Sequence, residues 1–491
     1  MKLAVTGVLL AAGLTGCDRI TQLRGLSTED ARAIGKEAYI AGYPAVTYYT
    51  AMHAQNIDTN SGSYKGPINT ILSESVLPKP GEAGASRPNG DVLISTLQAD
   101  LRAEPLVLCV PAIPNDRYYS MQFTDMNMFN FGSTDNRKNS GSTGCVLLIG
   151  PQFLGLVPTG VKQVLRSSSS FARVIYRTQV YGPEDLDVAA QLQAGFTIQP
   201  LSVYRRASAA NVLPVTPINW PAVGATASDA DFPELYNFLL PLAPLFDKAQ
   251  EKRFGRIGIG PDRSKPFSAL SAETRDAVLA GIAEGKAAIA ARAKAHETRV
   301  NGWRVDSGAG DRASFGGDGL LRAAVVSVAP FAPSPADAIF LPTDRDGRGA
   351  PLDASAAHYS ITFPAGLTPQ VDAFWSLSVY DARTGGLVAN PLERYRANSL
   401  TAQNMVSGAD GSITIYLGPT SPGPLYEPNW LPTPAGPFSL VLRMYMPKAT
   451  PPSILPAGNG SWAPPAVAVA DPPRLASSPA LPVVVGEPAL Q

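Results

Sequence analysis

Two strand-rich regions of this chain carry similar segments in the same order, and this internal repeat restricts the fold more than any other feature. The matched segments are VPA (110–112) with FPA (363–365), YYSMQFTD (118–125) with FWSLSVYD (374–381), LLIGP (147–151) with IYLGP (415–419), and FARVIYR (171–177) with FSLVLRM (438–444). Short apolar runs bounded by Pro, Gly, Asn and Asp are typical of antiparallel sandwiches or barrels. The repeat predicts two copies of one β sandwich. The alternative is two unrelated all-β domains whose strands are merely similar.

Helical patterns stand before and between the two copies. Ser27 and Thr28 precede Glu29 and Asp30, which predicts a capped helix start with acidic residues in the first turn. This helix is expected to be interrupted at Pro44. A second helical region follows Asp231, and its long helix begins near Ser271. The predicted class is therefore mainly β with helices (α+β), as tandem antiparallel, jelly-roll-like sandwiches with a helical insertion.

The same reading divides the chain into six parts. They are a signal peptide (1–16), a lipidated tether (17–26), the N-terminal helix with the first sandwich (27–228), a helical insertion (229–300), the second sandwich (301–447) and a tail (448–491). The tail is rich in Pro and Ala and lacks the periodicity of a packed element. We expect it to be disordered and mobile.

The first residues predict where the protein is located. One positive charge at Lys2 is followed by an apolar run from Leu3 to Leu14 and by Thr15, Gly16 and Cys17. The run is too short for a spanning helix and is typical of a signal peptide. The small residues before Cys17 resemble a bacterial lipobox, which implies a lipid anchor on this cysteine and a periplasm-facing protein of the cell envelope. An ordinary cleaved signal peptide is the alternative.

Cys109 and Cys145 remain after processing and lie in the apolar runs LVLCVP and CVLLIG. A buried unpaired cysteine behaves as a small hydrophobic residue, so free thiols are the favoured prediction. A disulfide is the alternative, because the predicted compartment permits one.

Charge and motifs exclude several classes of function. The formal net charge is 0 and the pI about 6.8, whereas dedicated nucleic-acid-binding domains carry a basic patch. The sequence holds no GxSxG, SxxK, HExxH or Walker A motif. The three histidines, His53, His296 and His358, have no metal-ligand spacing. We therefore predict no nucleic-acid partner, no metal and no cofactor.

The repeat also separates structural from functional candidates. Residues shared by both copies, Ser120 with Ser376 and Asp125 with Asp381, are explained by a common strand end and turn. Polar residues that are concentrated in one copy and have no counterpart in the other are not explained in this way. The candidate ligand-binding residues are Asp116, Arg117, Asn127, Asn130 and Arg137 in the first copy, and His358, Arg394 and Tyr395 in the second. Arginine, acids and aromatic rings suit an anionic or hydroxyl-bearing ligand. The alternative is that these polar residues simply lie in solvent-exposed loops and bind no ligand.

Several of these segments resemble a known pair of families. The first resemblance rests on NGDVLIS, LVLCVPAIPNDRYYSMQFTDMNMFNFGS and GCVLLIGP; the second rests on NGWR, LLRAAV, FPAGLTPQVDAFWSLSVYDARTGGLVANPLERY, DGSITIYLG and NWLPTPAGPFSLVLRMYMP. Together they resemble the bacterial two-domain proteins named domain of unknown function 1254 and domain of unknown function 1214. Where that family often has Asn-Arg-Asp, this chain has Asn89, Gly90 and Asp91. The resemblance implies an architecture but no activity.

These observations lead to two hypotheses on function. The first is an envelope lipoprotein that binds or hydrolyses a small polar or carbohydrate-like ligand at the junction of the sandwiches. The second is a non-catalytic structural or scaffolding lipoprotein. A pocket with convergent polar groups favours the first, and a flat apolar patch favours the second. Neither an enzyme activity nor an oligomeric state follows from the sequence.

Overall fold

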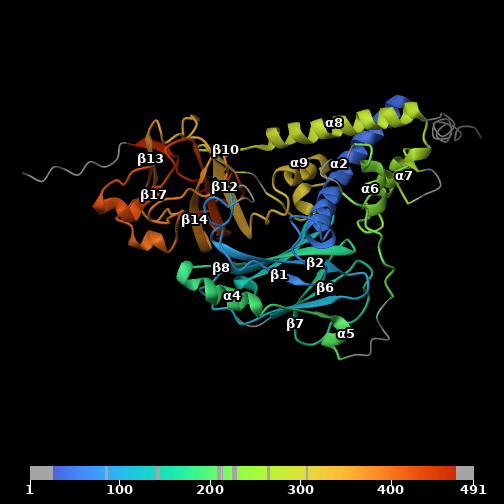
Figure 1. Ribbon diagram of the computed structural model, residues 1–491, viewed down its shortest axis with the longest axis horizontal. Coiled ribbons are helices and arrows are strands. Elements are labelled where there is room, and N and C mark those ends of the chain that lie inside the picture. The colour runs from blue at the N-terminus through green and yellow to red at the C-terminus, as the bar shows by residue number, and fades with distance from the viewer. Residues whose placement is uncertain are drawn as a thin grey trace, which may run out of the picture.

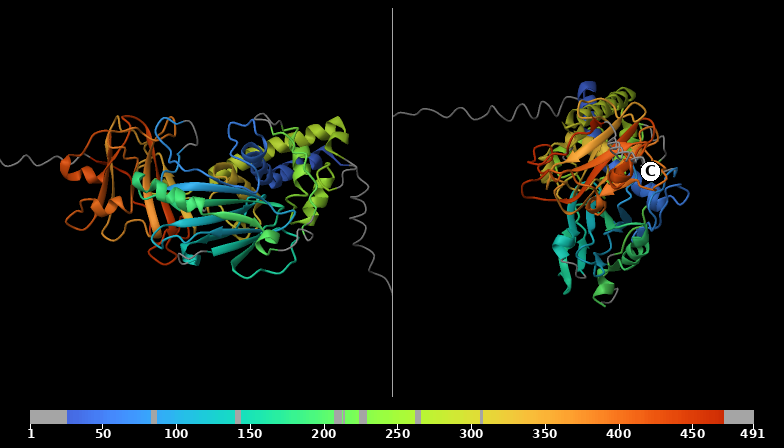
Figure 2. Two further views of the ribbon diagram at one scale, coloured as in Figure 1. Left: turned by 60° about the horizontal axis from the view of Figure 1, so that its bottom comes forward. Right: turned by 90° about the vertical axis from the view of Figure 1, so that its left-hand side faces the viewer.

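The computed structural model describes residues 26–82, 87–139, 144–206, 212, 214–223, 229–261, 266–305 and 308–470. The predicted signal peptide and Cys17 lie outside these residues. The described chain forms two β sandwiches and a group of helices, which lies over the first sandwich (Figure 1). The second sandwich forms one end of the molecule, and the right-hand view of Figure 2 shows it from that end.

The first sandwich consists of a five-stranded and a four-stranded sheet. The five-stranded sheet has the order β1 (Ile71–Ser73), β2 (Val92–Asp100), β8 (Phe171–Gln179), β4 (Tyr119–Asp125), β5 (Asn130–Asp135). The four-stranded sheet has the order β7 (Val161–Arg166), β6 (Gly144–Ile149), β3 (Leu106–Val110), β9 (Thr197–Pro200). Alternating apolar residues of both sheets, among them Leu97, Phe123 and Leu148, form the core between them.

The second sandwich has two four-stranded sheets. One has the order β12 (Ala338–Thr343), β18 (Phe438–Pro447), β14 (Val371–Asp381), β15 (Arg396–Asn398). The other has the order β17 (Trp430–Pro432), β16 (Ile413–Gly418), β13 (His358–Phe363), β19 (Ala468–Ala470). Its core contains Trp303, Leu341, Trp375 and Leu442.

The strand orders confirm the internal repeat. Leaving out β1, the order β2-β8-β4-β5 of the first sandwich corresponds to β12-β18-β14-β15 of the second, and β7-β6-β3-β9 corresponds to β17-β16-β13-β19. The pairing directions agree as well, because β6–β7 and β16–β17 are both parallel while the neighbouring pairs are antiparallel. The predicted α+β class with tandem sandwiches is confirmed. One sheet of each sandwich is purely antiparallel as predicted, whereas the sheets with β7 and β17 are mixed.

The main helices are α2 (Thr28–Met52), α6 (Phe232–Leu239), α7 (Lys248–Gly255), α8 (Ala272–His296) and α9 (Gly319–Val328). Short helices α3 (Asn136–Asn139), α4 (Leu186–Ala194) and α5 (Leu201–Tyr204) lie in the first sandwich, and β10 (Arg299–Val300) pairs with β11 (Trp303–Arg304) after α8. The predicted caps are confirmed: Ser27 Oγ accepts from the Asp30 N–H, and Ser271 Oγ from the Thr274 N–H.

Two expectations about the helices are wrong. Helix α2 is not interrupted at Pro44, which lies buried inside it. Its packing along α8 outweighs the missing hydrogen bond, and the contact is so close that a Cβ on Gly35 would lie 2.6 Å from the Val278 carbonyl oxygen. Residues 319–328, expected within the second sandwich, instead form α9, which packs against α2 and α8.

The predicted disordered tail is wrong for residues 448–470. Ile454, Trp462 and Val467 are buried in the core of the second sandwich, and β19 pairs with β13. The Trp462 indole N–H donates to the Leu367 carbonyl oxygen at 3.0 Å. The apolar residues of this segment are widely spaced and lack the regular period of a helix or strand. The sequence pattern therefore did not indicate that the segment is packed. The remaining predicted tail, residues 471–491, lies outside the described residues.

The favoured prediction of free thiols is also wrong. Cys109 on β3 and Cys145 on β6 are directly opposite each other and form a disulfide, with their Cα atoms 4.1 Å apart. Each cysteine alone looks like a small apolar strand residue, and the pairing follows only from the register of the two strands.

Candidate functional site

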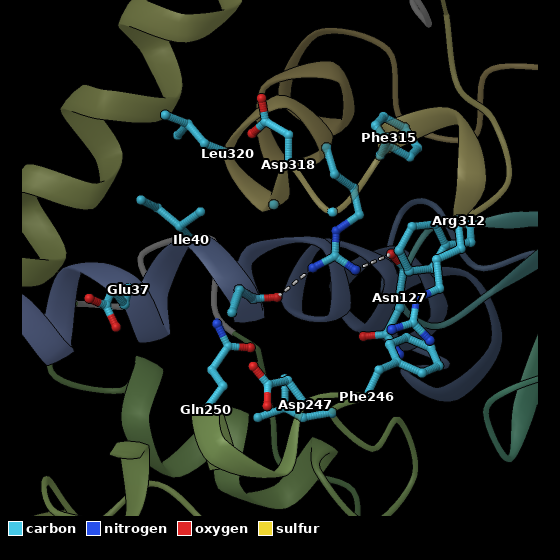
Figure 3. A pocket seen from close by; sticks show the side chains of 16 residues that line it. Glu37, Ile40, Asn127, Phe246, Asp247, Gln250, Arg312, Phe315, Asp318 and Leu320 are labelled. Atoms are coloured by element: carbon cyan, nitrogen blue, oxygen red, sulfur yellow. Dashed lines mark hydrogen bonds between the residues drawn. The ribbon is translucent and has the colours of Figure 1, made fainter. Parts of the chain in front are cut away.

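A cavity of about 470 Å³ lies where the helices meet the first sandwich. Its walls come from α2, the start of α9, the segment before α7, and the turn between β4 and β5 (Figure 3). Ile40, Leu245, Phe246, Phe315 and Leu320 make much of the lining apolar. A volume of this size accommodates a small organic molecule.

The turn between β4 and β5 is held in place by Asp125. Its Oδ1 accepts from the Phe129 N–H at 3.0 Å, and the Ser168 hydroxyl donates to Oδ2. Burial raises the pKa of Asp125, while these hydrogen bonds and the charge of Arg322 oppose the shift. The turn residue Met128 has φ +60°. Asp125 therefore shapes the loop that carries Asn127 and Phe129 to the cavity, and Asp381 likewise accepts from the Arg383 and Thr384 N–H groups in its own turn. The predicted structural role of this shared pair is confirmed.

Arg322 on α9 joins three parts of the cavity wall. Its guanidinium donates to the Ala41 carbonyl oxygen at 3.1 Å and to the Asn127 carbonyl oxygen at 3.4 Å, both drawn as dashed lines in Figure 3. The guanidinium carbon is 4.7 Å from the centre of the Phe129 ring. Burial lowers the pKa of Arg322, and Tyr236 and Asp125 oppose this shift. An arginine remains protonated in such surroundings, so the cavity wall carries a buried positive charge.

A second arginine stands at the cavity wall. Arg312 lies just before the short 3₁₀ turn Ala313–Phe315, and its guanidinium carbon is 3.9 Å from the centre of the Phe246 ring. No ion pair of Arg312 occurs in the part of the chain that the structure describes. Its charge therefore remains available to a ligand.

The carboxylates that line the cavity are already engaged. Glu37 pairs with Arg253 at 2.8 Å. Asp318 accepts from the Leu321 N–H at 2.8 Å and pairs with Arg292 at 3.2 Å. Asp247 accepts from the Ala249 N–H at the start of α7. The partners of these carboxylates are thus backbone N–H groups, Arg253 and Arg292, and not Arg312 or Arg322.

Two buried donors at this cavity have no acceptor. Arg322 Nε and Asn127 Nδ2 lack a hydrogen-bond partner among the described residues. An unpaired buried donor normally costs about 1–3 kcal/mol, so native structures seldom leave one without a reason. Both atoms are enclosed by protein, so a ligand acceptor such as a carboxylate or phosphate oxygen would reach them only if the cavity wall moved.

The junction of the sandwiches, where a ligand was expected, is filled by side chains. Phe374 stacks on Tyr445 with ring centres 4.2 Å apart, and Tyr118 contacts both rings. The buried carboxylate of Asp91 accepts from the Ser376 hydroxyl at 2.5 Å, and one of its oxygens is 3.3 Å from Arg396 Nε. A Cβ on Gly90 would lie 3.1 Å from an Arg396 guanidinium nitrogen, so the glycine leaves room for that side chain. The junction is therefore a packed interface.

Of the candidate residues in the first copy, Asn127 alone lines the cavity. Arg117 is buried in a bidentate ion pair with Asp185, at 2.6 Å for both contacts, and Asp116 beside it is exposed. Asn130 bonds to the Ala332 carbonyl oxygen and to neighbouring side chains of its own sheet. Arg137 pairs with Asp135 at 2.9 Å and lies 3.5 Å from Asp337.

The candidates of the second copy do not join this cavity. His358 begins β13 and lies 3.4 Å from the Thr420 hydroxyl. Arg394 donates to the carbonyl oxygens of Glu427 and Trp430 and lines a separate hollow of about 140 Å³. Tyr395 packs partly buried beside Tyr380. The structure thus spreads the predicted site residues over several places.

Sequence reasoning missed Arg322 and Arg312. Arg322 is a lone charge in the apolar helix GLLRAAVVSV, and a charged residue on an otherwise apolar helix signals a buried, functional or paired cation. Arg312 follows a Gly-rich loop and carries no comparable signal.

Across the described ranges, no cluster of three or more His, Cys, Asp or Glu side chains is arranged to hold a metal ion. Within the same residues, no helix combines the length and the apolar character that crossing a bilayer requires.

Comparison with known proteins identifies two domains. Residues 68–200 match the family described as protein of unknown function (DUF1254), and residues 337–449 match the family described as protein of unknown function (DUF1214). No curated protein matches the chain. The crystal structure of the VPA0106 protein from Vibrio parahaemolyticus is similar, with 22% identity and a TM-score of 0.72 over 90% of this chain and 100% of that one. An uncharacterised Burkholderia cenocepacia protein gives 13% identity and a TM-score of 0.41 over 90% and 94%.

Proposed function

We propose that this chain, which carries a DUF1254 domain followed by a DUF1214 domain, binds a small organic anion in the cavity between its helices and its first sandwich. The ligand would carry a carboxylate or phosphate group on an apolar body. The anionic group would face Arg322, Asn127 and Arg312, and the apolar body would contact Phe246 and Phe315.

The observation that carries this proposal is the positive charge of Arg312, which lines the cavity beside Phe246 and has no ion pair among the described residues. A neutral sugar would need acceptors as well as donors, but the carboxylates at the wall are taken up by helix caps and ion pairs. We therefore propose an organic acid as the ligand, in place of the polar or carbohydrate-like molecule expected from the sequence.

Binding is favoured over hydrolysis. General acid–base chemistry needs a titratable group that reaches the reacting atoms, and the carboxylates Glu37, Asp247 and Asp318 are held by structural partners. Asp125, with its raised pKa, is buried behind the turn that it shapes. These features support a binding site rather than a catalytic one.

A thermal-shift experiment tests the proposal on the chain from Asp18 onward. Phenyl phosphate and benzoate serve as probes, with phenol and benzamide as their neutral counterparts. A ligand that binds the native state raises the melting temperature with increasing concentration. We expect the two acids to stabilise the protein and the neutral molecules to do so far less.

Arg312→Gln is the discriminating variant, because Arg312 contacts Phe246 and has no ion pair within the described residues. It should lose most of the response to phenyl phosphate while its melting temperature without ligand stays near that of the wild type. Arg348→Gln is the matched control, since Arg348 is exposed on the second sandwich. An equal response of both variants would contradict the proposed site. No response to any acid would favour the alternative, a structural or scaffolding protein.

We further propose that the protein is an envelope lipoprotein anchored through Cys17. The support is the small-residue motif before this cysteine, and the Cys109–Cys145 disulfide is compatible with an oxidising compartment. Cys17→Ala should abolish incorporation of labelled fatty acid and release the protein from the membrane fraction. Unchanged labelling in that variant would contradict the anchor.

A further inference from the structure

The loop between β6 and β7, residues 150–160, exposes large apolar side chains. Leu154 is 95% exposed, Leu156 83% and Val157 53%. Single exposed leucines are common on soluble proteins, but neighbouring ones on a single loop mark an interaction surface.

The loop is fixed to the protein by hydrogen bonds to its backbone. The Arg166 guanidinium donates to the carbonyl oxygens of Gly150, Pro151 and Phe153 at 3.0, 3.2 and 2.8 Å. Arg205, directly after α5, donates to the Leu156 carbonyl oxygen, and the Tyr204 hydroxyl donates to the Thr159 carbonyl oxygen. The leucines therefore project from an anchored loop. Because the loop is already ordered, binding of a partner costs little further conformational entropy.

A groove of about 450 Å³ lies beside the same loop. Leu101, Phe153, Leu154 and Leu201 give it apolar walls, and Arg205 lies at its side. Its carboxylate, Glu104, accepts from the Ser202 N–H and hydroxyl, so it is engaged within the protein. The groove thus extends the apolar surface of the loop and brings a cation next to it.

The charged residues in the two segments that carry and hold the loop are all basic. Residues 144–170 contain Lys162 and Arg166 and no Asp or Glu, and residues 197–206 contain Arg205 and Arg206 and no Asp or Glu. Lys162 and Arg206 are exposed. A basic border favours an anionic partner and disfavours a second copy of the same surface, because like charges would meet.

We propose that the loop 150–160 docks this protein on an anionic bilayer surface. Leu154, Leu156 and Val157 would enter the boundary between headgroups and acyl chains. Lys162 and Arg206 would face the lipid phosphates. Shallow insertion of apolar side chains together with nearby basic residues is how peripheral proteins bind anionic membranes. This inference is independent of the cavity and of the anchor at Cys17.

Vesicle sedimentation tests the proposal with the chain from Asp18 onward, which keeps every described residue and lacks Cys17. One set of vesicles contains equal parts of phosphatidylcholine and phosphatidylglycerol, and the other contains phosphatidylcholine alone. We expect binding to the anionic vesicles that weakens as salt is raised. The double variant Leu154→Ser and Leu156→Ser should reduce the partition coefficient about tenfold or more. Lys162→Gln and Arg206→Gln should each reduce it about fivefold on anionic vesicles alone.

Leu425→Ser is the matched control, since Leu425 is 54% exposed on the second sandwich. It should bind like the wild type, and all variants should keep the wild-type melting temperature. The proposal is overturned if the wild type fails to sediment with anionic vesicles, or if the double leucine variant binds as well as the wild type. A wild-type dimer that the leucine variant converts to a monomer would also overturn it, because the loop would then be an interface between copies.

Discussion

The guanidinium of Arg322 on α9 lies against the Phe129 ring while it donates to the backbone of α2 at Ala41. One side chain thus ties two helices to the turn between β4 and β5. The same side chain leaves its Nε without an acceptor at the cavity wall. Structural and ligand-binding roles therefore coincide at Arg322, and variants of it should change both.

Arg322→Met should lower the free energy of unfolding by about 2–4 kcal/mol, because two buried carbonyl oxygens lose their donor. The variant should also lose its response to phenyl phosphate. Urea unfolding with and without the probe measures both effects. Arg292→Met is the control: Arg292 forms a half-exposed ion pair with Asp318, and such pairs contribute about 0–1 kcal/mol. If Arg292→Met is destabilised as much as Arg322→Met, the hydrogen bonds of Arg322 to α2 and to the turn between β4 and β5 do not have the stabilising role proposed here.

Asp125 predicts a pH dependence of stability. Burial raises the pKa of Asp125 above its ordinary value of 3.8, so the native state holds the proton more tightly than the unfolded state does. This proton linkage favours the native state at low pH, and the advantage is lost as the pH rises through the raised pKa. Asp125→Asn cannot ionise and escapes that loss. The stability of the variant relative to the wild type should therefore rise with pH above about 4 and then level off.

Chemical denaturation at a series of pH values measures this difference. Asp381→Asn is the matched control, since Asp381 holds the corresponding turn but its pKa lies below the ordinary value. Its difference from the wild type should change in the opposite direction with pH. A flat difference for Asp125→Asn would contradict the raised pKa.

The repeat shows how much of the fold could be predicted from sequence. Strands such as β4 and β14 alternate between core and outer face in the same way, and their similarity predicted two copies of one sandwich, which the shared strand orders confirm. Helix α9 and residues 448–470 were missed for a different reason. Their apolar residues pack against elements that are distant in the sequence. The local spacing of apolar residues does not indicate which distant elements they contact.

The candidate site was predictable only in part. Asn127 was found because its copy-specific polarity had no structural explanation. Arg117, Asn130 and Arg137 have the same sequence signal but serve ion pairs and hydrogen bonds within or beside the first sandwich. A sequence shows that a polar residue needs a partner, but not whether that partner is another residue or a ligand.

Trp462 allows a test of the packed segment after β18. Its side chain is 5% exposed within the second core, and removing a buried tryptophan costs about 3–5 kcal/mol. Trp462→Ala should lower the free energy of unfolding by that amount, measured by urea denaturation. Tyr64→Ala, at a 36% exposed aromatic residue, should cost much less. A Trp462 variant as stable as the wild type would instead support a tail that is mobile from residue 448 onward.

Arg117 distinguishes a structural arginine from a ligand-binding one. The guanidinium and the Asp185 carboxylate are both nearly buried. Although burial alone would raise it, the pKa of Asp185 is lowered by the hydrogen bonds from Arg117 and from the Tyr181 N–H. Arg117→Ala leaves this carboxylate without its cation and should cost about 3–5 kcal/mol at neutral pH.

A lowered pKa means that the contribution of the pair is present above the ordinary value of 3.8 and is lost as the pH falls through the lowered pKa. The penalty of Arg117→Ala should therefore shrink in acid, whereas its response to phenyl phosphate should equal that of the wild type at every pH where it is folded. Arg256→Ala is the control, because Arg256 and Asp30 form an ion pair in which both side chains are exposed, and its loss should cost about 1 kcal/mol or less. If Arg117→Ala proves as stable as the wild type but loses the response to phenyl phosphate, then the anion binds beside Arg117 and Asp185, and the cavity at Arg322 is not the site.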